Sequence, residues 1–403
     1  MNNWKLRYFT VFTGQALSQI GSAVTQFVLM WWIASTTKDI STMATAGIFA
    51  LLPQAILGPI GGILADRYSR RLIMIVSDSI TALCMVVLIS LFANNIVELW
   101  HIYALLFIRS SMQAFQSPSA QSSTVMLVPE SFLQRAAGLN QSIVSLMTIA
   151  AAPVGAMAMS LMTFEGALMI DVVTACLGIA PLLFFKIPQP ERSEIHTSAW
   201  TEFKEGLSLV WHSKPLRQLY SLNGIIVLVI MPCFTLVPLL IAEHFKGGPN
   251  EVAIMEGLAG LAMLLGGVAT SIINPSKKVV TFLIGLGLGS FAVALTALMP
   301  EKSFIIATVF WVLCGFAYTY SNTPIIALLQ AKIPPQLQGR AFSLLTTTSA
   351  LASPIGLSFF GTLGSYTGIR NIYILAGVLT GLICLFSLRL KELRNLENNN
   401  FLQ

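Results

Sequence analysis

The segment GGILADRYSRR, Gly61–Arg71, is the most informative about the fold, because it places charged residues between two apolar runs. Four of the six positions from Asp66 to Arg71 are charged, whereas only 10% of the whole chain is. Each flanking run is about 20 residues long, which is the length that crosses ~30 Å of hydrocarbon as a helix. We therefore expect a short polar loop between two membrane-spanning helices.

The composition of the whole chain favours the same class of protein. Hydrophobic residues make up 55% of the 403 residues and the mean hydropathy is +0.77, which is too apolar for a water-soluble domain. In lipid only helices and closed barrels satisfy their backbone polar groups, and the alternating segments of a barrel are absent. The sequence predicts an all-α membrane protein with twelve spans, near residues 8–33, 43–64, 72–93, 100–125, 138–161, 166–186, 217–241, 252–273, 279–299, 303–330, 342–364 and 371–390.

The basic residues indicate an orientation. With the N-terminus inside, 18 lysines and arginines face the cytoplasm and 4 face out. Cytoplasmic loops of membrane proteins carry such an excess of positive charge. We expect both termini in the cytoplasm and a multi-pass protein of the plasma (inner) membrane. The same bias accounts for the net charge of +6 without a nucleic-acid partner.

The chain repeats itself at about half its length. VPESFLQRA (Val128–Ala136) returns as IPPQLQGRA (Ile333–Ala341), a displacement of 205 residues. Both halves start inside, so two similar six-helix bundles are related by an axis along the membrane normal, as in one group of secondary transporters. The predicted organisation is a bundle over 1–186, a cytoplasmic linker with an amphipathic helix over 187–216, a second bundle over 217–390 and a tail over 391–403.

One arginine and three acidic residues inside predicted spans are singled out. On translocon-insertion scales, a charged residue at the middle of a spanning helix raises the free energy of membrane insertion by about 2.5–3.5 kcal/mol. Each such residue therefore needs a partner or a function. Arg109 lies roughly 14 Å into its span, counted at 1.5 Å per residue from Trp100. It is a candidate to tune a proton-carrying acid, and a structural ion pair is the alternative. The candidate acids for proton coupling are Asp78, Asp171 and Glu256.

A polar stripe follows the first predicted span. Gln15, Gln19, Ser22 and Gln26 are spaced four, three and four residues apart, so they share one helix face. They are expected either to bond to neighbouring helices or to line a wet cavity. A pocket of amides, aromatics and methionine suits a large, mostly apolar ligand with scattered oxygens. Its further candidates are Gln113, Asn140, Asn223, Met231, Phe234, Tyr318 and Asn322, with ordinary packing as the alternative.

The opening stretch resembles the signature loop of the major facilitator superfamily, G-x-L-x-D-R-x-G-R-[RK]. Gly62, Leu64, Asp66, Arg67, Arg70 and Arg71 match this motif, and Ser69 replaces its second glycine. The resemblance implies a gating loop that holds the cytoplasmic side closed in the outward-facing state. Gly58 and Gly62, four residues apart, are expected to let another helix approach closely. LLFIRSSMQAFQSP resembles the motif in the fourth helix of the family, and the arginine of that motif corresponds to Arg109. The motif is associated with proton-coupled members.

A narrower resemblance covers essentially the whole chain. GQALSQIGSAVTQFVLMWWI, LPQAILGPIGGILADRYSRR and LVPESFLQRAAGLNQS are similar to drug:proton antiporters of the macrolide-efflux type. This resemblance implies a monomer in the lipid bilayer that exports hydrophobic drugs, most directly macrolides, in exchange for protons, with the proton gradient in place of a cofactor. Another small solute or a non-transporting membrane protein is the alternative. The four histidines are scattered and no Walker or H-E-x-x-H motif occurs, so we expect neither a metal site nor an enzyme.

Overall fold

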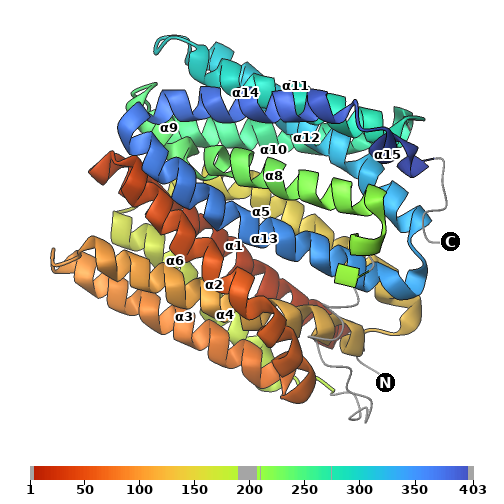
Figure 1. Cartoon of the computed structure of the whole chain (residues 1–403). Helices are drawn as coiled ribbons and strands as arrows, with labels where there is room; N and C mark the ends of the chain where they lie inside the picture. The colour runs from red at the N-terminus through yellow and green to blue at the C-terminus, as the bar shows by residue number, and fades with distance from the viewer. Residues whose placement is uncertain (1–3, 189–206, 209, 274, 398–403) are drawn as a thin grey trace. The chain divides into compact units, whose positions relative to one another are not determined.

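The structure, a computed structural model, describes residues 4–188, 207–208, 210–273 and 275–397. Every regular element within these residues is a helix (Figure 1). The chain divides into two compact units. Unit 1 comprises residues 1–32 and 49–196, and unit 2 comprises residues 33–48 and 197–403. The predicted amphipathic linker helix lies mostly outside the described residues, and the predicted domain boundaries stay a prediction.

Unit 1 is formed by six long helices. The last residues of the first helix and the first residues of the second belong to unit 2. The six helices are α1 (Trp4–Thr37), α2 (Ile40–Arg67), α3 (Arg70–Ala93), α4 (Leu99–Leu127), α5 (Leu133–Leu161) and α6 (Phe164–Phe184), with the 3-10 turn η1 (Glu130–Phe132) before α5. Local chemistry sets several starts. Ser69 accepts a hydrogen bond from the Leu72 N–H at 3.4 Å, and Thr163 accepts one from the Gly166 N–H at 3.2 Å. These side chains cap α3 and α6, whose first N–H groups have no partner in the helix.

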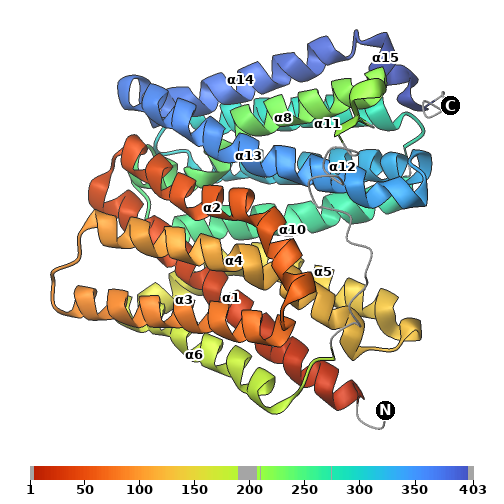
Figure 2. The same cartoon turned by 60° about the horizontal axis from the view of Figure 1, so that its bottom comes forward.

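The helices of unit 2 follow in the same order along the chain. They are α8 (Lys214–Thr235), α9 (Val237–Glu243), α10 (Pro249–Ile273), α11 (Lys278–Leu298), α12 (Phe304–Lys332), α13 (Pro335–Thr367), α14 (Ile369–Ser387) and α15 (Lys391–Arg394), with the 3-10 turn η2 (Asn395–Glu397) at the end. Within this unit α11 packs between α12 and α14 (Figure 2). The predicted seventh span is interrupted at Leu236, between α8 and α9, because Pro232 and Pro238 remove helical N–H donors.

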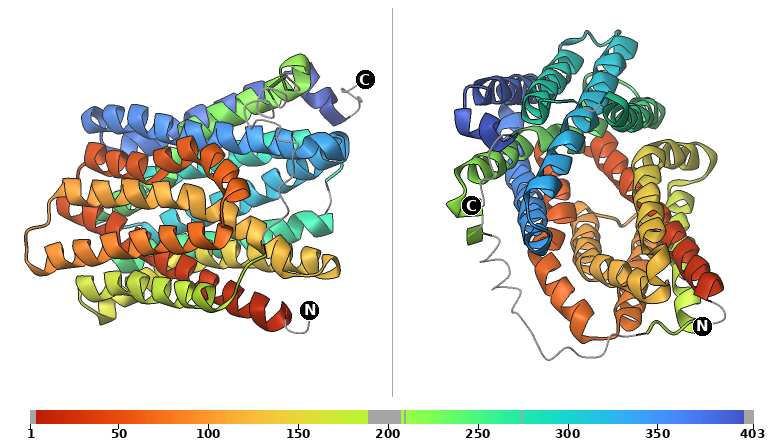
Figure 3. Two further views of the ribbon diagram at one scale, coloured as in Figure 1. Left: turned by 90° about the horizontal axis from the view of Figure 1, so that it is seen from below. Right: turned by 90° about the vertical axis from the view of Figure 1, so that its right-hand side faces the viewer.

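The prediction of a helical membrane protein is confirmed. Counted over the described residues, eleven helices are long and apolar enough to cross a membrane. The remaining predicted segment forms α4, a helix of 29 residues that carries Arg109 and several glutamines and serines and is therefore less apolar. Figure 3 shows the long helices from two further directions. The count of twelve spans and the orientation of the termini stay predictions.

Proline and glycine residues mark where helices of one unit approach most closely. Pro118 lacks the N–H that would bond to the Ala114 carbonyl, and Gly61 of α2 lies against that carbonyl, 2.0 Å from where a Cβ would stand. In unit 2, Gly356 of α13 lies against the Leu228 carbonyl in the same way, also at 2.0 Å, four residues before Pro232. The predicted approach of another helix at Gly58 and Gly62 is not found within unit 1, because nothing lies within 4 Å of either Cβ position, and it stays a prediction.

Candidate functional site

The interior of unit 1 holds a polar cavity of about 230 Å³. Six residues singled out from the sequence line it: Gln19, Ser22, Gln26, Asp78, Arg109 and Gln113. They come from α1, α3 and α4, so three separate helices present polar side chains to one space. A second cavity, of about 270 Å³, includes Gln15 and Asn140 and shares Gln19, Gln113 and Gln116 with the first.

Gln15 connects three helices inside unit 1. Its Nε2 donates to the Gly178 carbonyl at 3.1 Å and to Asp78 Oδ2 at 3.2 Å. Because a carbonyl can only accept, this contact fixes the orientation of the amide. The Gln15 Oε1 then accepts from Gln116 Nε2 at 2.7 Å. Both interpretations of the first-span stripe are therefore realised: Gln15 bonds to neighbouring helices, whereas Gln19 and Gln26 line the cavity.

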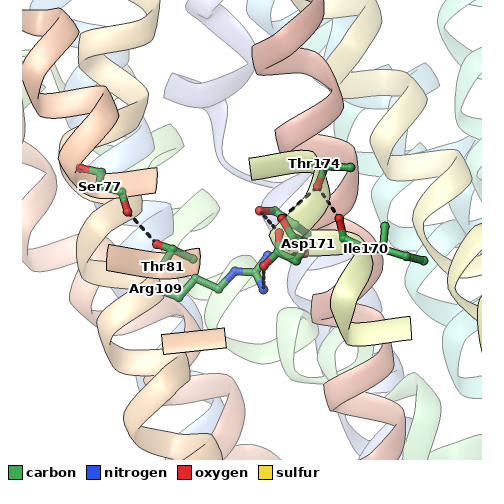
Figure 4. A network of polar contacts seen from close by, with 7 residues as sticks. Ser77, Thr81, Arg109, Ile170, Asp171 and Thr174 are labelled. Carbon is green, nitrogen blue, oxygen red and sulfur yellow. Dashed lines mark hydrogen bonds and ion pairs between the residues drawn. The ribbon is translucent and has the colours of Figure 1, made fainter. Parts of the chain in front are cut away.

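A buried ion pair ties α4 to α6. Arg109 Nη1 lies 3.6 Å from Asp171 Oδ2, and the two side chains are 12% and 3% exposed. Ser22 of α1 joins both partners: its hydroxyl donates to Asp171 Oδ1 at 2.9 Å, and its carbonyl accepts from Arg109 Nη2. Figure 4 shows the Arg109 guanidinium pointing toward Asp171. The pair offsets the loss of hydration that either charge alone would suffer.

Asp78 lies in α3 on the wall of the first cavity. Asp78 accepts a hydrogen bond from the uncharged amide of Gln15, and it forms no ion pair with the residues that the structure describes. Asp78 therefore differs from Asp171, which faces a guanidinium. Ionisable side chains that face a polar cavity inside an apolar helical bundle are typical of solute and proton pathways.

Unit 2 presents a different environment around its candidates. Glu256 in α10 has a buried Oε1 with no hydrogen-bond partner, and the Trp311 side chain bonds to its carboxyl group. Trp311 in turn packs against Phe234, with ring centroids 5.1 Å apart, and against Tyr373, at 6.3 Å. This surrounding is an aromatic core in which the carboxyl group is isolated from any cation among the described residues.

The remaining unit 2 candidates are described by their contacts within that unit. The Asn223 amide donates to the Ser349 hydroxyl at 2.9 Å, which links α8 to α13. The Asn322 amide bonds to the Tyr318 carbonyl one turn back in its own helix, at 2.9 Å. Met231 lies in α8 one residue before Pro232, and its carbonyl accepts from the Thr235 hydroxyl at 3.5 Å. These contacts are those of helix packing and of side chains bonded within one helix.

The predicted gating loop shows what its arginines bind. Arg70 is buried and donates to the Ala65 carbonyl at 3.1 Å and the Ser122 carbonyl at 3.0 Å. Arg71 donates to the Leu183 carbonyl at 2.8 Å and to the Leu182 carbonyl, near the end of α6. Such cations stabilise helix C-termini, where carbonyls lack partners and the dipole is negative. Arg67 is exposed, and the side chain of Asp66 lies outside the described residues, so its role in the gating loop stays a prediction.

Gln54 and Ser110 are among the cavity-lining residues that the sequence analysis did not predict. Gln54 follows Pro53 in an otherwise apolar run, and Ser110 adjoins Arg109. The Ser110 hydroxyl accepts a hydrogen bond from the Gln54 backbone N–H at 3.1 Å. A single polar residue in an apolar helix gives no periodic signal, and only the position of Ser110 beside Arg109 hinted at a wet environment.

The helical bundle with its charged, cavity-lining interior is that of a membrane transporter, and comparison with known proteins names the family. The sequence model of the Major Facilitator Superfamily matches residues 11–357 and 234–402. Macrolide efflux protein A from Streptococcus pyogenes is 30% identical over 399 residues, 98% of each chain, and the protein of that name from Enterococcus faecalis is 30% identical over 77% of this chain and 97% of its own.

A solved structure agrees. The bacterial homologue of the human lysosomal transporter Spinster, in an inward-facing and unoccupied conformation, matches with a TM-score of 0.73 at 15% identity, covering 100% of this chain and 98% of that one. The chain belongs to the Major Facilitator Superfamily. It is a multi-pass protein of the inner membrane, and the resemblance inferred from Gly61–Arg71 is confirmed.

Proposed function

We propose that the protein exports hydrophobic drugs, most directly macrolides, by alternating access driven by proton entry. The observation that carries this proposal is the polar cavity inside unit 1, where Asp78 and Arg109 share one space with several amides and hydroxyls. Amides and hydroxyls complement a ligand with scattered oxygens, and the ionisable groups supply a site for the coupling ion. Similarity over 98% of the chain to proteins named for macrolide efflux supports the substrate class.

The ion pair gives this cavity a fixed positive element. Arg109 is held by the Ser22 carbonyl and by Asp171, so its guanidinium keeps one position on the wall between α1, α4 and α6. A fixed guanidinium donates hydrogen bonds in a defined direction and cannot lose its proton. The cavity therefore combines a permanent cation with one carboxyl group, Asp78, that is able to change its charge, as proton coupling requires.

Everted membrane vesicles test the proposal. With an imposed proton gradient, vesicles that contain the protein are expected to accumulate radiolabelled erythromycin, and an uncoupler is expected to abolish that accumulation. Vesicles without the protein are the control. Uptake that persists after uncoupling would remove proton coupling, and an absence of erythromycin uptake together with uptake of another drug would remove the macrolide assignment.

A susceptibility panel in a host that lacks its own efflux pumps tests the gating loop in parallel. Expression of the protein is expected to raise resistance to macrolides, and Asp66→Asn is expected to lower that resistance with unchanged protein in the membrane. Glu130→Gln, at an exposed position of the turn η1 outside this loop, is the matched control for the loss of one negative charge.

A further inference from the structure

We propose that Asp78 is the carboxyl group that takes up and releases the coupling proton, while Asp171 remains the ionised partner of Arg109. This inference rests on the proposed proton-driven export and names the residue that performs it. Three observations separate the two acids: their partners, their access to the cavity and the balance of charge around them.

Asp171 has a cation and a hydroxyl as partners, although its Oδ2 accepts no hydrogen bond. One of its oxygens faces the Arg109 guanidinium at 3.6 Å, and the other accepts from the Ser22 hydroxyl at 2.9 Å. The residue is 2% exposed and does not line the cavity of about 230 Å³. A proton placed on Asp171 would leave the buried Arg109 guanidinium without its counter-ion. An uncompensated buried charge of this kind strongly destabilises a protein. The contacts of Asp171 therefore favour a permanent charge.

Asp78 is placed to change its charge. It accepts one neutral hydrogen bond, from Gln15 Nε2, and it lines the cavity directly. A polar cavity needs only about 15 Å³ to hold a water molecule, so this one has room for several. A proton can thus leave the Asp78 carboxyl group for a cavity water: the O–H bond breaks, its electron pair stays on the carboxylate, and the proton moves on as hydronium.

The charged groups facing Asp78 are few. Arg109 comes from α4 and Asp171 from α6, and the middle of α1 contributes the neutral Gln15. The other residues of these helices that carry a charge at neutral pH lie toward the helix ends: Lys5 and Arg7 in α1, Arg70 and Arg71 in α3, and Glu165 in α6. The remaining titratable groups are neutral or weakly basic: Tyr8 in α1, the thiols of Cys84 in α3 and Cys176 in α6, and His101 and Tyr103 in α4. With Asp78, Asp171 and Arg109 all ionised, the set has one negative charge in excess. One proton on Asp78 makes the set neutral.

Gln15 is the positioning residue for this proton site. Its Oε1 is held by Gln116 and its Nε2 by the Gly178 carbonyl, so the donor aimed at Asp78 stays in place. Because Gln116 also lines both cavities, a ligand that displaces Gln116 would disturb the hydrogen bond that holds Asp78. Ligand binding and proton binding would then be coupled through Gln15.

Infrared difference spectroscopy tests the assignment without any substrate. The full-length protein in lipid nanodiscs is compared between acidic and alkaline buffer. We expect a C=O stretch of a neutral carboxylic acid that is lost in Asp78→Asn and retained in Glu256→Gln. Gln15→Met is expected to shift the frequency of this band without removing it. A band that persists in Asp78→Asn, or that vanishes in Glu256→Gln, would overturn the proposal.

Transport assays form the second arm, in proteoliposomes with radiolabelled erythromycin as the probe. Asp78→Asn is expected to lose uptake driven by a pH gradient by at least about tenfold while keeping drug-for-drug exchange. Asp78→Glu is expected to restore gradient-driven uptake in part, with its pH profile displaced. Loss of exchange together with gradient-driven uptake, in a variant that stays monodisperse, would count against a proton-specific role.

The two arms separate this inference from the proposed function. If the wild-type protein does not transport erythromycin but the infrared band still depends on Asp78, the macrolide assignment fails and the proton site stands. If erythromycin is exported under a proton gradient and the band does not depend on Asp78, the proton site fails and the export function stands.

Discussion

The interiors of the two units differ far more than their helices do. Unit 1 contains an ion pair, a further carboxyl group and a network of amides beside a cavity. At the displacement of 205 residues that relates Val128–Ala136 to Ile333–Ala341, the positions of Asp78, Arg109 and Asp171 hold Leu283, Cys314 and Ala376. All three are buried. At these three positions the repeat has therefore kept residues in a helix while the charged side chains occur in unit 1 only.

The difference indicates that the two units have different roles. A charged interior requires matched partners, and each mismatched change leaves a buried charge without compensation. An aromatic and aliphatic interior such as that of unit 2 tolerates changes of similar size and gives mainly rigidity. The comparison predicts that substitutions of polar residues in unit 1 have larger effects than those in unit 2. Substitutions at Gly61 of unit 1 and Gly356 of unit 2, which lie against a carbonyl in the same way, should have equal effects.

The largest effect is expected for Arg109→Ala in unit 1. This change leaves the buried Asp171 carboxylate without its cation and should lower the free energy of unfolding by about 3–5 kcal/mol. Thermal and denaturant unfolding of the purified protein in detergent measures the change. Gradient-driven export should also be lost, because the fixed cation of the cavity is gone.

A double variant shows that the loss comes from the unpaired charge. Arg109→Leu combined with Asp171→Leu removes both partners and should destabilise the protein less than Arg109→Ala alone. Cys314→Ala, at the corresponding position of unit 2, is the matched control and should have a smaller effect, since it removes only one buried sulfur atom. Equal losses for Arg109→Ala and Cys314→Ala would contradict the contrast between the units.

An intermediate effect is expected at Gly61 and Gly356, two of the glycines that pack against carbonyls. A Cβ at Gly61 or at Gly356 would stand 2.0 Å from a carbonyl oxygen, so Gly→Ala at either position forces two helices apart. Overpacking of this kind lowers the free energy of unfolding by about 1–3 kcal/mol. Gly62→Ala is the control, because nothing lies within 4 Å of its Cβ position, and alanine is the better helix former. A loss at Gly61 alone would show that the close approach is not shared by the units.

Most of the fold could be predicted from the sequence. The spans follow from long apolar runs separated by charged loops, and each predicted segment corresponds to a helix in the described residues, with ends displaced by a few residues. The break at Leu236 was not predicted, although Pro232 and Pro238 were visible. A proline within a span predicts a freed carbonyl, but whether the helix bends or breaks depends on what packs beside it.

The candidate site could be predicted only in part. The spacing of Gln15, Gln19 and Ser22 placed them on one face, because helix periodicity is a local property. The pairing of Arg109 with Asp171 was left open, since it depends on which helices are neighbours. In unit 2, Phe234 and Tyr318 could not be assigned from residue type, because an aromatic side chain in a core and one in a ligand pocket have the same composition and spacing.

The smallest effect is expected for Glu256→Gln in unit 2. The amide keeps the shape of the side chain and an oxygen that can accept from Trp311, while the unpartnered Oε1 no longer belongs to an ionisable group. The free energy of unfolding should change by no more than about 1 kcal/mol, the net value of one hydrogen bond. Erythromycin uptake under a pH gradient should match that of the wild type, in contrast to Asp78→Asn. If Glu256→Gln abolishes gradient-driven uptake while exchange continues, then both units bind the coupling proton, and the assignment of different roles to the two units is wrong.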